Sequence, residues 1–343
     1  LESDTVVRME MTVKTGEPAR FGIRPIDPPE DLRVPRMTAT DAIDALVAKA
    51  DEQAAKDAFS GVLLVANGDE VLLQRAWGLA DRAAGTPVTP DTKFRLGSMN
   101  KMFTAVATLQ LVEAGKLSLD GTVGQYLPDY PNAEVAQVTI RQLLTHTGGT
   151  GDFFGPEFDE RRLSLKTHDD YVRLFGERAP THPPGTEPRY SNYGFLLLGK
   201  IIEQVSGKSY YDYIDAHVFS PAGMRDSGSS PEEVAVPGRA VAYMRQDGAW
   251  TDAADTLPYR GTAAGGGYST AGDLLKFARA LLEGKLLSPE LLAEATRNQT
   301  PWYGYGFMTR EQEGGRMFGQ AGGAPGMNGD LRIYPAQGIV VVA

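Results

Sequence analysis

The sequence of 343 residues contains no cysteine, and this absence excludes several kinds of chemistry at once. It rules out disulfides, thiol nucleophiles and thiolate metal ligands. The chain also lacks a run of about 18 apolar residues, so we expect no membrane span. No basic stripe offsets the formal net charge of -10, which argues against nucleic acid as a partner, because such binding requires clustered cations.

Histidine is scarce as well, and its spacing carries no metal-binding signal. The four histidines show neither the H-E-x-x-H pattern nor another paired ligand spacing. We therefore expect no metal and no cofactor, and the pattern disfavours a zinc hydrolase. The local sequence LLTHTGG indicates that the first of them holds a helix end. The four are His146, His168, His182 and His217.

The overall composition is that of an ordinary globular protein, with 42% hydrophobic and 23% charged residues. A chain of this length can bury a large core and form two lobes. It opens at Leu1-Glu2 without an export segment, and the missing Met indicates processing or truncation. The final run GIVVVA is strand-like and stops at its most hydrophobic point, so we expect a packing element beyond Ala343.

Strand patterns lie towards both ends of the chain, and helical patterns fill the middle. This order predicts an α/β (α+β) fold, in which one antiparallel sheet flanked by helices is built from both ends and an all-helical lobe is inserted between them. The expected strands are 6–13, a pair within 61–78, 303–310, 316–323, 330–335 and 338–343; the expected helices are 41–58, 98–115, 139–146 and 193–207.

The same patterns divide the chain into three parts. Residues 1–58 form an N-terminal segment that contains a Pro-rich connector, 24–35, and the first helix. The sheet lobe combines 59–116 with 259–343, and 117–258 form the helical lobe.

Two glycines predict local features of the backbone, a hairpin turn and the end of a helix. Asn67-Gly68 separates two apolar runs and is typical of a tight hairpin turn with positive φ. Gly115 ends an apolar helical run and suits a left-handed helix C-terminus.

The stretch FRLGSMNKMFTAVATLQLVEAG places one lysine in an otherwise almost wholly apolar helix. Ser98 and Lys101 are the only serine and lysine in the chain at this order and spacing, and residues three apart share a helix face. A serine hydroxyl becomes a good nucleophile when a neighbouring base takes its proton, and the N–H groups at a helix start favour negative charge. The pair therefore predicts a nucleophile with its base.

The lysine must spend time neutral if it is to act as a base. Its free pKa is about 10.4, and burial can lower a lysine pKa by roughly 3 to 5 units. Met99, Met102, Phe103 and Val106 surround Lys101 in the sequence with apolar side chains. We therefore expect desolvation to lower the pKa of Lys101.

A second acid or base is needed to pass a proton to a leaving group, and YSN at 190–192 supplies a candidate. The Tyr190 hydroxyl can donate or accept, while Asn192, two residues on in an extended turn, can hold a substrate carbonyl or Lys101. A rival Tyr-x-Asn begins at Tyr130, within the Pro-rich connector LPDYPN, and fits an ordinary turn.

A glycine-dense segment, FGQAGGAPGMNGDLRIYP, adjoins strand-like runs near the end of the chain. Such a strand permits close approach of a substrate to backbone N–H groups. A glycine-rich hairpin loop is the alternative that this pattern leaves open.

Six stretches together resemble the serine β-lactamase and penicillin-binding-protein superfamily, specifically its class C-like branch with β-lactamase-fold carboxylesterases and D-alanyl-D-alanine carboxypeptidases. They occur in the family's order over roughly residues 60–343. The stretches are FRLGSMNKMFTAVATLQLVEAGKLSLD, IRQLLTHTGGTGDF, PPGTEPRYSNYGFLLLGKIIEQVSGKSYYDYI, FSPAGM, AGGGYSTAGDLLKFARALL and GQAGGAPG.

The resemblance implies a β-lactamase-like fold with the active site at the interface of the two lobes. It implies that Ser98 is acylated, that Lys101 is its base and that Tyr190 is a second acid or base, with Asn192 orienting the substrate. It further implies an exported or periplasmic location, although this chain shows no signal peptide.

The resemblance also places Gln320, with Gly322, in the family's Lys-Thr-Gly or His-x-Gly strand motif. The N–H groups of Gly323 and Ser98 would form the oxyanion hole. This chain departs from the family at Gln320, a neutral residue that offers no positive charge to a substrate carboxylate. Losing a charge-assisted hydrogen bond weakens such recognition by roughly 1.5 to 3 kcal/mol.

These observations predict a serine hydrolase that acts through an acyl-enzyme, with uncharged esters favoured among small-molecule ester, amide or peptide substrates. Enzyme alternatives are a D-alanyl-D-alanine carboxypeptidase, a D-aminopeptidase or a weak β-lactamase. A catalytically silent penicillin-binding sensor is the alternative from another class.

Two other motifs suggest different chemistry. GYSTA at 267–271 approaches the G-x-S-x-G elbow of α/β-hydrolases, which would make Ser269 the nucleophile. That fold requires a histidine after the serine, and the last histidine is His217. Thr270 with Asp273 instead predicts a helix N-cap and a capping box. GGG at 265–267 lacks the Lys-Ser/Thr of a phosphate-binding loop and fits a tight turn.

Overall fold

A six-stranded antiparallel sheet lies at the centre of the larger of two compact units in the computed structural model. The structure describes residues 6–12, 20–26, 37–312 and 314–343, and the units are 1–52 and 53–343. The predicted fold class is confirmed. In spatial order the strands are β11 (Met308–Gln312), β12 (Gly315–Ala324), β13 (Met327–Tyr334), β14 (Ile339–Val342), β3 (Gly61–Asn67) and β4 (Glu70–Trp77).

The sheet joins early and late parts of the larger unit. The last strand, β14, pairs antiparallel with β3, and it also pairs with β13. Leu331, Val342 and Leu64 therefore form a row across three strands, and all three are almost fully buried. The prediction of one sheet built from distant segments is confirmed for the strands of the larger unit. The strand expected at 6–13 is not part of this sheet, because it pairs in a two-stranded sheet of its own.

The hairpin between β3 and β4 turns one residue later than the sequence indicated. Asn67 pairs with Glu70, so the two turn residues are Gly68 and Asp69. The positive φ, 54°, falls on Gly68. The turn thus uses glycine at its first central position and leaves Asn67 in the strand.

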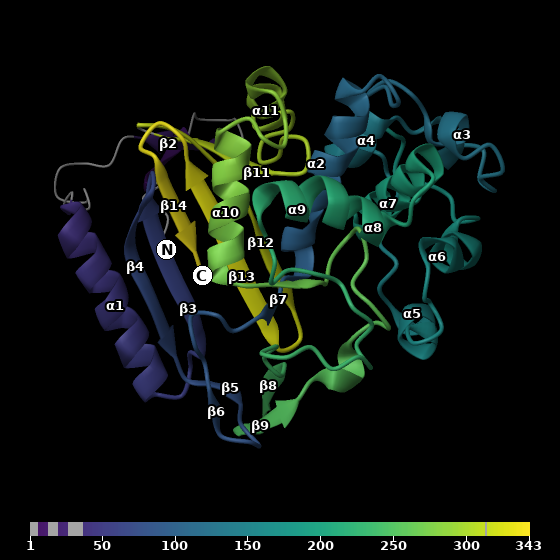
Figure 1. Ribbon diagram of the computed structural model, residues 1–343. Coiled ribbons are helices and arrows are strands. Elements are labelled where there is room, and N and C mark those ends of the chain that lie inside the picture. Colours follow the sequence, from purple (N-terminus) through teal and green to yellow (C-terminus); the bar gives the residue numbers. More distant parts are fainter. Residues whose placement is uncertain (1–5, 13–19, 27–36, 313) are drawn as a thin grey trace. The chain divides into compact units, whose positions relative to one another are not determined.

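Helix α2 (Asn100–Glu113) crosses the core beside β12, and α10 (Ala271–Leu282) packs on β3 and β14. Phe103 of α2 joins the two helices, because its ring meets that of Phe277 edge-on at 4.9 Å. Figure 1 shows α10 lying along the sheet. A 3₁₀ turn, η2 (Gly97–Met99), leads into α2. Gly115 lies just after the end of α2 and has a φ of 66°, as predicted.

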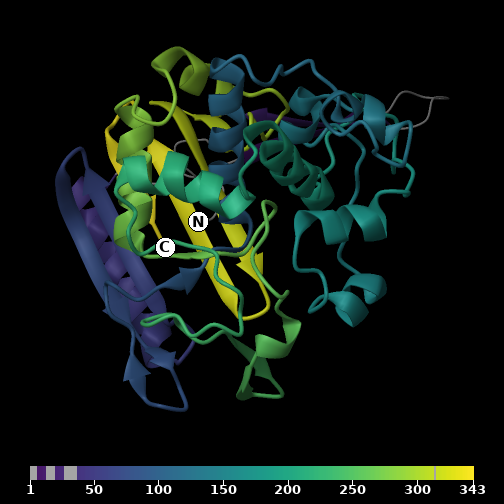
Figure 2. The same cartoon turned by 45° about the vertical axis from the view of Figure 1, so that its right-hand side comes forward.

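The chain between α2 and α10 is mainly helical, as predicted, and Figures 1 and 2 show its helices gathered to one side of the sheet. It also contains a hairpin that the sequence did not indicate, β8 (Tyr243–Gln246) with β9 (Ala249–Asp252). The helical elements are α3 (Val123–Tyr126), η3 (Val135–Gln137), α4 (Ile140–Leu144), α5 (Pro156–Arg161), α6 (His168–Phe175), α7 (Asn192–Ser206), α8 (Tyr210–Ile214), η4 (Asp215–Phe219), α9 (Ser220–Ala222) and η5 (Ala254–Thr256).

The short elements of the larger unit include a two-stranded pair of β7 (Phe94–Arg95) with β10 (Tyr268–Ser269). Of these two strands, β7 directly precedes η2 in the chain. The others are β5 (Leu79–Asp81), β6 (Thr86–Pro87) and α11 (Pro289–Ala295). The proposed division at 59–116, 117–258 and 259–343 remains a prediction.

The N-terminal unit contains β1 (Val6–Thr12), which pairs antiparallel with β2 (Arg20–Ile26). The predicted strand 6–13 corresponds to β1, and its last residue lies outside the described residues. Of the predicted connector 24–35, the first three residues belong to β2 and the rest lie outside the described residues. Helix α1 (Ala39–Ala55), predicted at 41–58, begins in this unit and ends in the other.

The predicted strand 303–310 begins only at Met308. The preceding aromatic residues Tyr303, Tyr305 and Phe307 are completely buried in an irregular bend. Gly306 causes part of the difference, because its φ of 79° is incompatible with a continuous strand. The alternation of aromatic residues and glycine imitates the two-residue period of a strand.

The part of the chain that the structure describes contains no helix long and apolar enough to cross a membrane.

The close approach of Gly306 to α2 gives a stability prediction. A Cβ at Gly306 would lie 2.1 Å from the Cβ of Ala105, whereas a Cβ at Gly68 would meet nothing within 4 Å. Both glycines have positive φ, so each Gly→Ala variant bears a backbone cost of about 1 to 2 kcal/mol. Gly306→Ala should lose about 1 to 3 kcal/mol more through overpacking. Urea unfolding of both variants measures the difference, and equal losses would contradict the packing argument.

Candidate active site

Ser98 lies in the 3₁₀ turn η2, where two glycines let the sheet approach it. Gly97 has a φ of 52°, and a Cβ there would lie 2.8 Å from the backbone nitrogen of Gly323. A Cβ at Gly322 would lie 1.9 Å from the carbonyl oxygen of Leu96. Both positions therefore require glycine, and the end of β12 packs directly on the turn that carries Ser98.

Lys101, in the first turn of α2, is 0% exposed and its amine has three polar neighbours. Its Nζ lies 3.3 Å from Ser98 Oγ, donates to Asn192 Oδ1 at 2.7 Å and donates to the carbonyl oxygen of Ala264. The structure thus brings Ser98 and Lys101 together, and the same amine also contacts Asn192.

Burial lowers the pKa of Lys101 to about 7, against a partial rise caused by the negative charge of Asp152. The amine also lies 4.7 Å from the ring centre of Tyr190 and 5.5 Å from that of Phe195. A neutral amine has two N–H bonds and one lone pair. Since Asn192 and Ala264 accept those two hydrogens, the lone pair is left for the hydroxyl of Ser98.

Tyr190 precedes α7 and directs its hydroxyl towards Ser98. Desolvation raises the pKa of Tyr190 to about 12, while a hydrogen bond with the Ser98 side chain opposes that rise. The residue is 40% exposed, so Tyr190 is open to solvent as well as to Ser98. The rival Tyr130 is buried, and its hydroxyl lies 3.1 Å from that of Tyr193.

Asn192 is the first residue of α7 and does not occupy the predicted extended turn. Ser191 is the extended N-cap, and its hydroxyl accepts from the N–H of Gly194. This cap fixes the helix start, so that Asn192 Oδ1 faces Lys101 while its Nδ2 donates to Asp152 Oδ2 at 2.7 Å.

The last part of β12 has a free edge on the side away from β13. β11 pairs with β12 only as far as Gly319, so residues 320–324 have no strand partner on that side. Gln320 is 2% exposed and faces Tyr303. The two side chains approach without hydrogen-bond geometry, so Gln320 Oε1 and the Tyr303 hydroxyl are both buried without a partner.

His146 lies next to Tyr190, two residues after α4 ends, which agrees with a role at a helix end. Its Nδ1 accepts the N–H of Ser191, and its ring centre is 4.4 Å from that of Tyr190. Burial and the nearby Lys101 lower the pKa of His146 well below its usual value. A neutral imidazole therefore supports the segment that carries Tyr190.

Ser269, the alternative nucleophile, is buried and its hydroxyl pairs with that of Ser227 at 2.7 Å. Thr270 caps α10 as predicted, by accepting the N–H of Asp273. The predicted capping box is absent, because the Asp273 carboxylate accepts from the backbone N–H of Asp226 and not from that of Thr270. These groups serve the local structure.

No metal site competes with this arrangement among the residues that the structure describes, since no group of three or more His, Asp and Glu side chains is placed to hold an ion.

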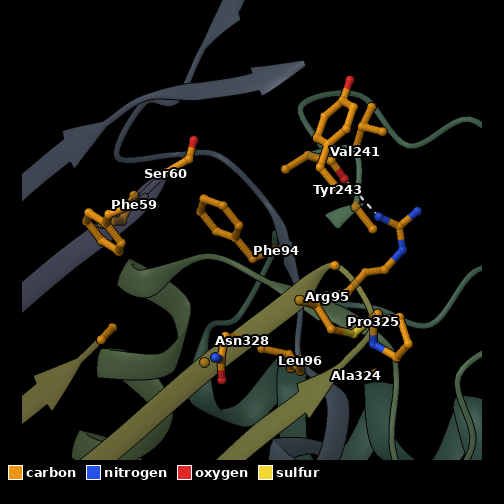
Figure 3. A pocket seen from close by; sticks show the side chains of 18 of the residues that line it. Phe59, Ser60, Phe94, Arg95, Leu96, Val241, Tyr243, Ala324, Pro325 and Asn328 are labelled. Atoms are coloured by element: carbon orange, nitrogen blue, oxygen red, sulfur yellow. Dashed lines mark hydrogen bonds between the residues drawn. The ribbon is translucent and has the colours of Figure 1, made fainter. Parts of the chain in front are cut away.

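A separate cavity of about 650 Å³ lies beyond the turn that carries Ser98. Figure 3 shows Phe59, Phe94, Tyr243 and Asn328 around it. Leu96 and Met99 also line this cavity, whereas Ser98, Lys101 and Tyr190 do not. This cavity is therefore not the place where the reactive groups meet.

Two important contacts were missed in the sequence. Asp152 belongs to the stretch IRQLLTHTGGTGDF, which resembles the family, but its separation from Asn192 in the sequence does not indicate that the two residues are in contact. The carbonyl oxygen of Ala264 has no sequence signature at all, because every residue carries one.

The comparisons with known proteins agree with this geometry. The family model described as Beta-lactamase matches residues 43–343. The chain is similar to Esterase EstB of Burkholderia gladioli, with 33% identity over 291 residues, 72% of this chain and 74% of that protein.

Two solved structures extend the comparison. One is a penicillin-binding protein from Bacillus halodurans, with a TM-score of 0.79 and 33% identity over 85% of this chain and 93% of the other. The second is a D-amino acid amidase from Ochrobactrum anthropi SV3, with a TM-score of 0.75 and 26% identity over 88% and 90%. The chain spans between 62% and 79% of the length of four curated relatives. With a family match over most of its length and the same fold, this chain belongs to the Beta-lactamase family.

Proposed function

We propose that this chain is a serine hydrolase that forms an acyl-enzyme on Ser98 and prefers uncharged esters. The observation that carries the proposal is the environment of Lys101. Its pKa is about 7, both hydrogens of its neutral amine have acceptors, and its lone pair is left for Ser98 Oγ, 3.3 Å away. These are the properties of a base that activates a serine.

In the first step, neutral Lys101 takes the hydroxyl proton of Ser98 as Oγ attacks the ester carbonyl carbon. The carbonyl oxygen becomes an oxyanion, which the N–H groups of Ser98 and Gly323 would stabilise. Such donors contribute about 2.7 to 4 kcal/mol each to the transition state. The proximity of Gly97 to the Gly323 nitrogen supports this pairing.

In the second step, the oxyanion collapses and the bond to the alkoxide leaving group breaks. The proton held by Lys101 passes through the Tyr190 hydroxyl to the alkoxide, which leaves as an alcohol. Water then attacks the acyl carbon, gives one proton back through the same groups to Ser98 Oγ, and releases the acid. The high pKa of Tyr190, about 12, suits a phenol that relays a proton without remaining ionised.

The charges around the site support uncharged substrates. Gln320 supplies no cation where the family's motif has Lys or His. The carboxylate of Asp152, held by Asn192 Nδ2, is close enough to raise the pKa of both Lys101 and Tyr190. A substrate carboxylate would meet this negative charge, which disfavours β-lactams and peptides that end in a free carboxylate.

Asp152 favours one second candidate, a D-aminopeptidase or D-amino-acid amidase. Substrates of that class carry an ammonium group next to the scissile carbonyl, and an anion beside the base would attract it. The structural similarity to a D-amino acid amidase agrees with this alternative.

The pH dependence of acylation tests the base. In wild type, kcat/KM for p-nitrophenyl butyrate should rise with pH and reach half its maximum near pH 7, because Lys101 is protonated and inactive below its pKa. Ser98→Ala should abolish turnover, and Lys101→Met should reduce kcat by about 10² to 10⁴-fold. Stopped-flow kinetics measure the rates.

Mass spectrometry of quenched reactions with the ester, nitrocefin and D-alanine amide separates the alternatives. A transient adduct on Ser98 with ester turnover supports the proposal, and turnover of the amide alone supports the second candidate. A permanent adduct with nitrocefin indicates a sensor. A flat pH profile down to about pH 5 would exclude Lys101 as the base.

Folding stability gives an independent test of the same pKa. The unfolded chain keeps Lys101 protonated up to about pH 10.5, whereas the folded chain releases the proton near pH 7. The unfolded state therefore binds more protons in this window, and stability should rise with pH by up to about 1.4 kcal/mol per unit relative to Lys101→Met. Urea unfolding at pH 7.5 and 9.5 measures the effect, with Lys116→Met at an exposed position as the control. A constant difference between wild type and Lys101→Met would refute the lowered pKa.

Replacing Gln320 tests the substrate class. Gln320→Lys supplies the missing cation and should raise kcat/KM for nitrocefin, relative to the uncharged ester, by about 10- to 100-fold, the equivalent of a charge-assisted hydrogen bond. Gln320→Met changes the same buried position without adding charge and should leave the ratio near that of wild type. If the lysine variant folds, as shown by circular dichroism, and the ratio is unchanged, Gln320 does not determine the preference.

A further inference from the structure

We infer that His168 and Glu203 are positioning residues for the base: they hold the Ala263–Ala264 backbone so that the Ala264 carbonyl orients the amine of Lys101. This inference rests on the proposed function. Neither residue contacts Ser98 or Lys101, and no sequence pattern connects either of them with the reactive centre.

The turn at residues 262–265 is tied to α2 on one side. The carbonyl oxygen of Ala263 accepts from Thr104 Oγ1 at 2.7 Å, and that of Thr262 accepts from Asn100 Nδ2 at 2.7 Å. The turn closes on itself through the N–H of Thr262, which donates to the Gly265 carbonyl at 2.7 Å. The next carbonyl, that of Ala264, accepts from Lys101.

His168, the first residue of α6, connects the same turn to helix α7. Its Nε2 accepts the N–H of Ala263 at 3.3 Å, and its Nδ1 lies 2.9 Å from Glu203 Oε1. Because a carboxylate can only accept, Nδ1 carries the hydrogen and Nε2 is left as the acceptor for Ala263. Glu203 Oε1 also accepts the N–H of Tyr210 at 3.2 Å, which fixes the carboxylate in turn.

Helix α7 lines up these contacts on a single face. Along α7, Gly199 follows Asn192 by seven residues and Glu203 follows Gly199 by four. An α-helix turns by about 100° per residue, so these spacings place all three on one side of the helix. A Cβ at Gly199 would lie 2.4 Å from the Cβ of Ala263 and 2.9 Å from His168 Nε2. The absence of a side chain at Gly199 is therefore what lets α7, the turn and His168 meet.

The consequence for the base is geometric. Neutral Lys101 places one hydrogen on Asn192 and one on Ala264, and the direction of its lone pair follows from both acceptors. Asn192 and Glu203 both belong to α7. This helix therefore positions the Asn192 acceptor directly, and it positions the Ala264 carbonyl through the contacts of Glu203 with His168 and of His168 with Ala263. Misplacing a reacting group by about 1 Å can cost 10²-fold in rate.

The test compares acylation in four variants of the full chain. His168→Leu removes both hydrogen bonds and keeps the bulk, whereas His168→Gln keeps one donor and one acceptor. Thr104→Val releases the Ala263 carbonyl from the opposite side. Thr108→Val is the matched control, because Thr108 is equally buried on α2 but bonds only the backbone of its own helix.

We expect His168→Leu to lower the acylation rate with p-nitrophenyl butyrate by about 10- to 100-fold, with the dissociation constant for substrate within about twofold of wild type. The midpoint of the pH profile should move to lower pH, because an ammonium that has lost an acceptor gives up its proton more readily. His168→Gln should recover most of the rate, Thr104→Val should reproduce the shift in midpoint, and Thr108→Val should behave as wild type.

A purely structural role would lower the active fraction without moving the midpoint. The inference is overturned if Thr104→Val and His168→Leu both show an unchanged midpoint and thermal melting shows that His168→Leu is folded. The proposed function would remain intact in that case. If wild type forms no adduct on Ser98, the proposed function itself fails. The two failures are therefore distinguishable.

Discussion

The arrangement around Ser98 depends on one unfavourable event, the burial of a lysine amine away from water. In water Lys101 would remain protonated, and a protonated amine cannot take the hydroxyl proton. Complete burial lowers its pKa to about 7, and the nearby carboxylate of Asp152 limits that fall. The opposing effects leave an amine that can exchange its proton under ordinary conditions.

A buried amine also has to be satisfied by hydrogen bonds, since an unpaired polar group in the interior is costly. Asn192 and the Ala264 carbonyl meet this need from two different segments. The sheet adds the third component: β12 reaches the turn of Ser98 because Gly97 and Gly322 leave room for it. The larger unit thus brings α2, α7, β12 and the turn at 262–265 to one point.

The sequence was most informative where the chemistry is local. Ser98 and Lys101 are three residues apart where the 3₁₀ turn η2 runs into α2, so their proximity follows from local helical geometry. Helix ends marked by Gly115 and Thr270 were found for the same reason. The Tyr-x-Asn pattern indicated Tyr190 and Asn192 as candidates, and the resemblance to a known family then implied their roles and placed Gln320, Gly322 and Gly323 at the site.

Long-range contacts made by backbone atoms could not be predicted. Lys101 and Ala264 are 163 residues apart, and nothing distinguishes one carbonyl from another in a sequence. Gly199 is similar, because a glycine within a helix gains its meaning only when its neighbour is known. The strand expected at 303–310 failed for a physical reason as well: burial of alternate aromatic residues also occurs in a bend that positive-φ glycine permits.

The close packing at Gly199 limits how this part of the chain can vary. Helix α7, His168 and the turn at 262–265 meet there without an intervening side chain. Even a single methyl group at Gly199 would fall 2.4 Å from the Cβ of Ala263, so a larger residue would push the helix away from the turn that carries Ala264. A substitution that leaves every reactive side chain in place would thus still disturb the acceptors of the Lys101 amine.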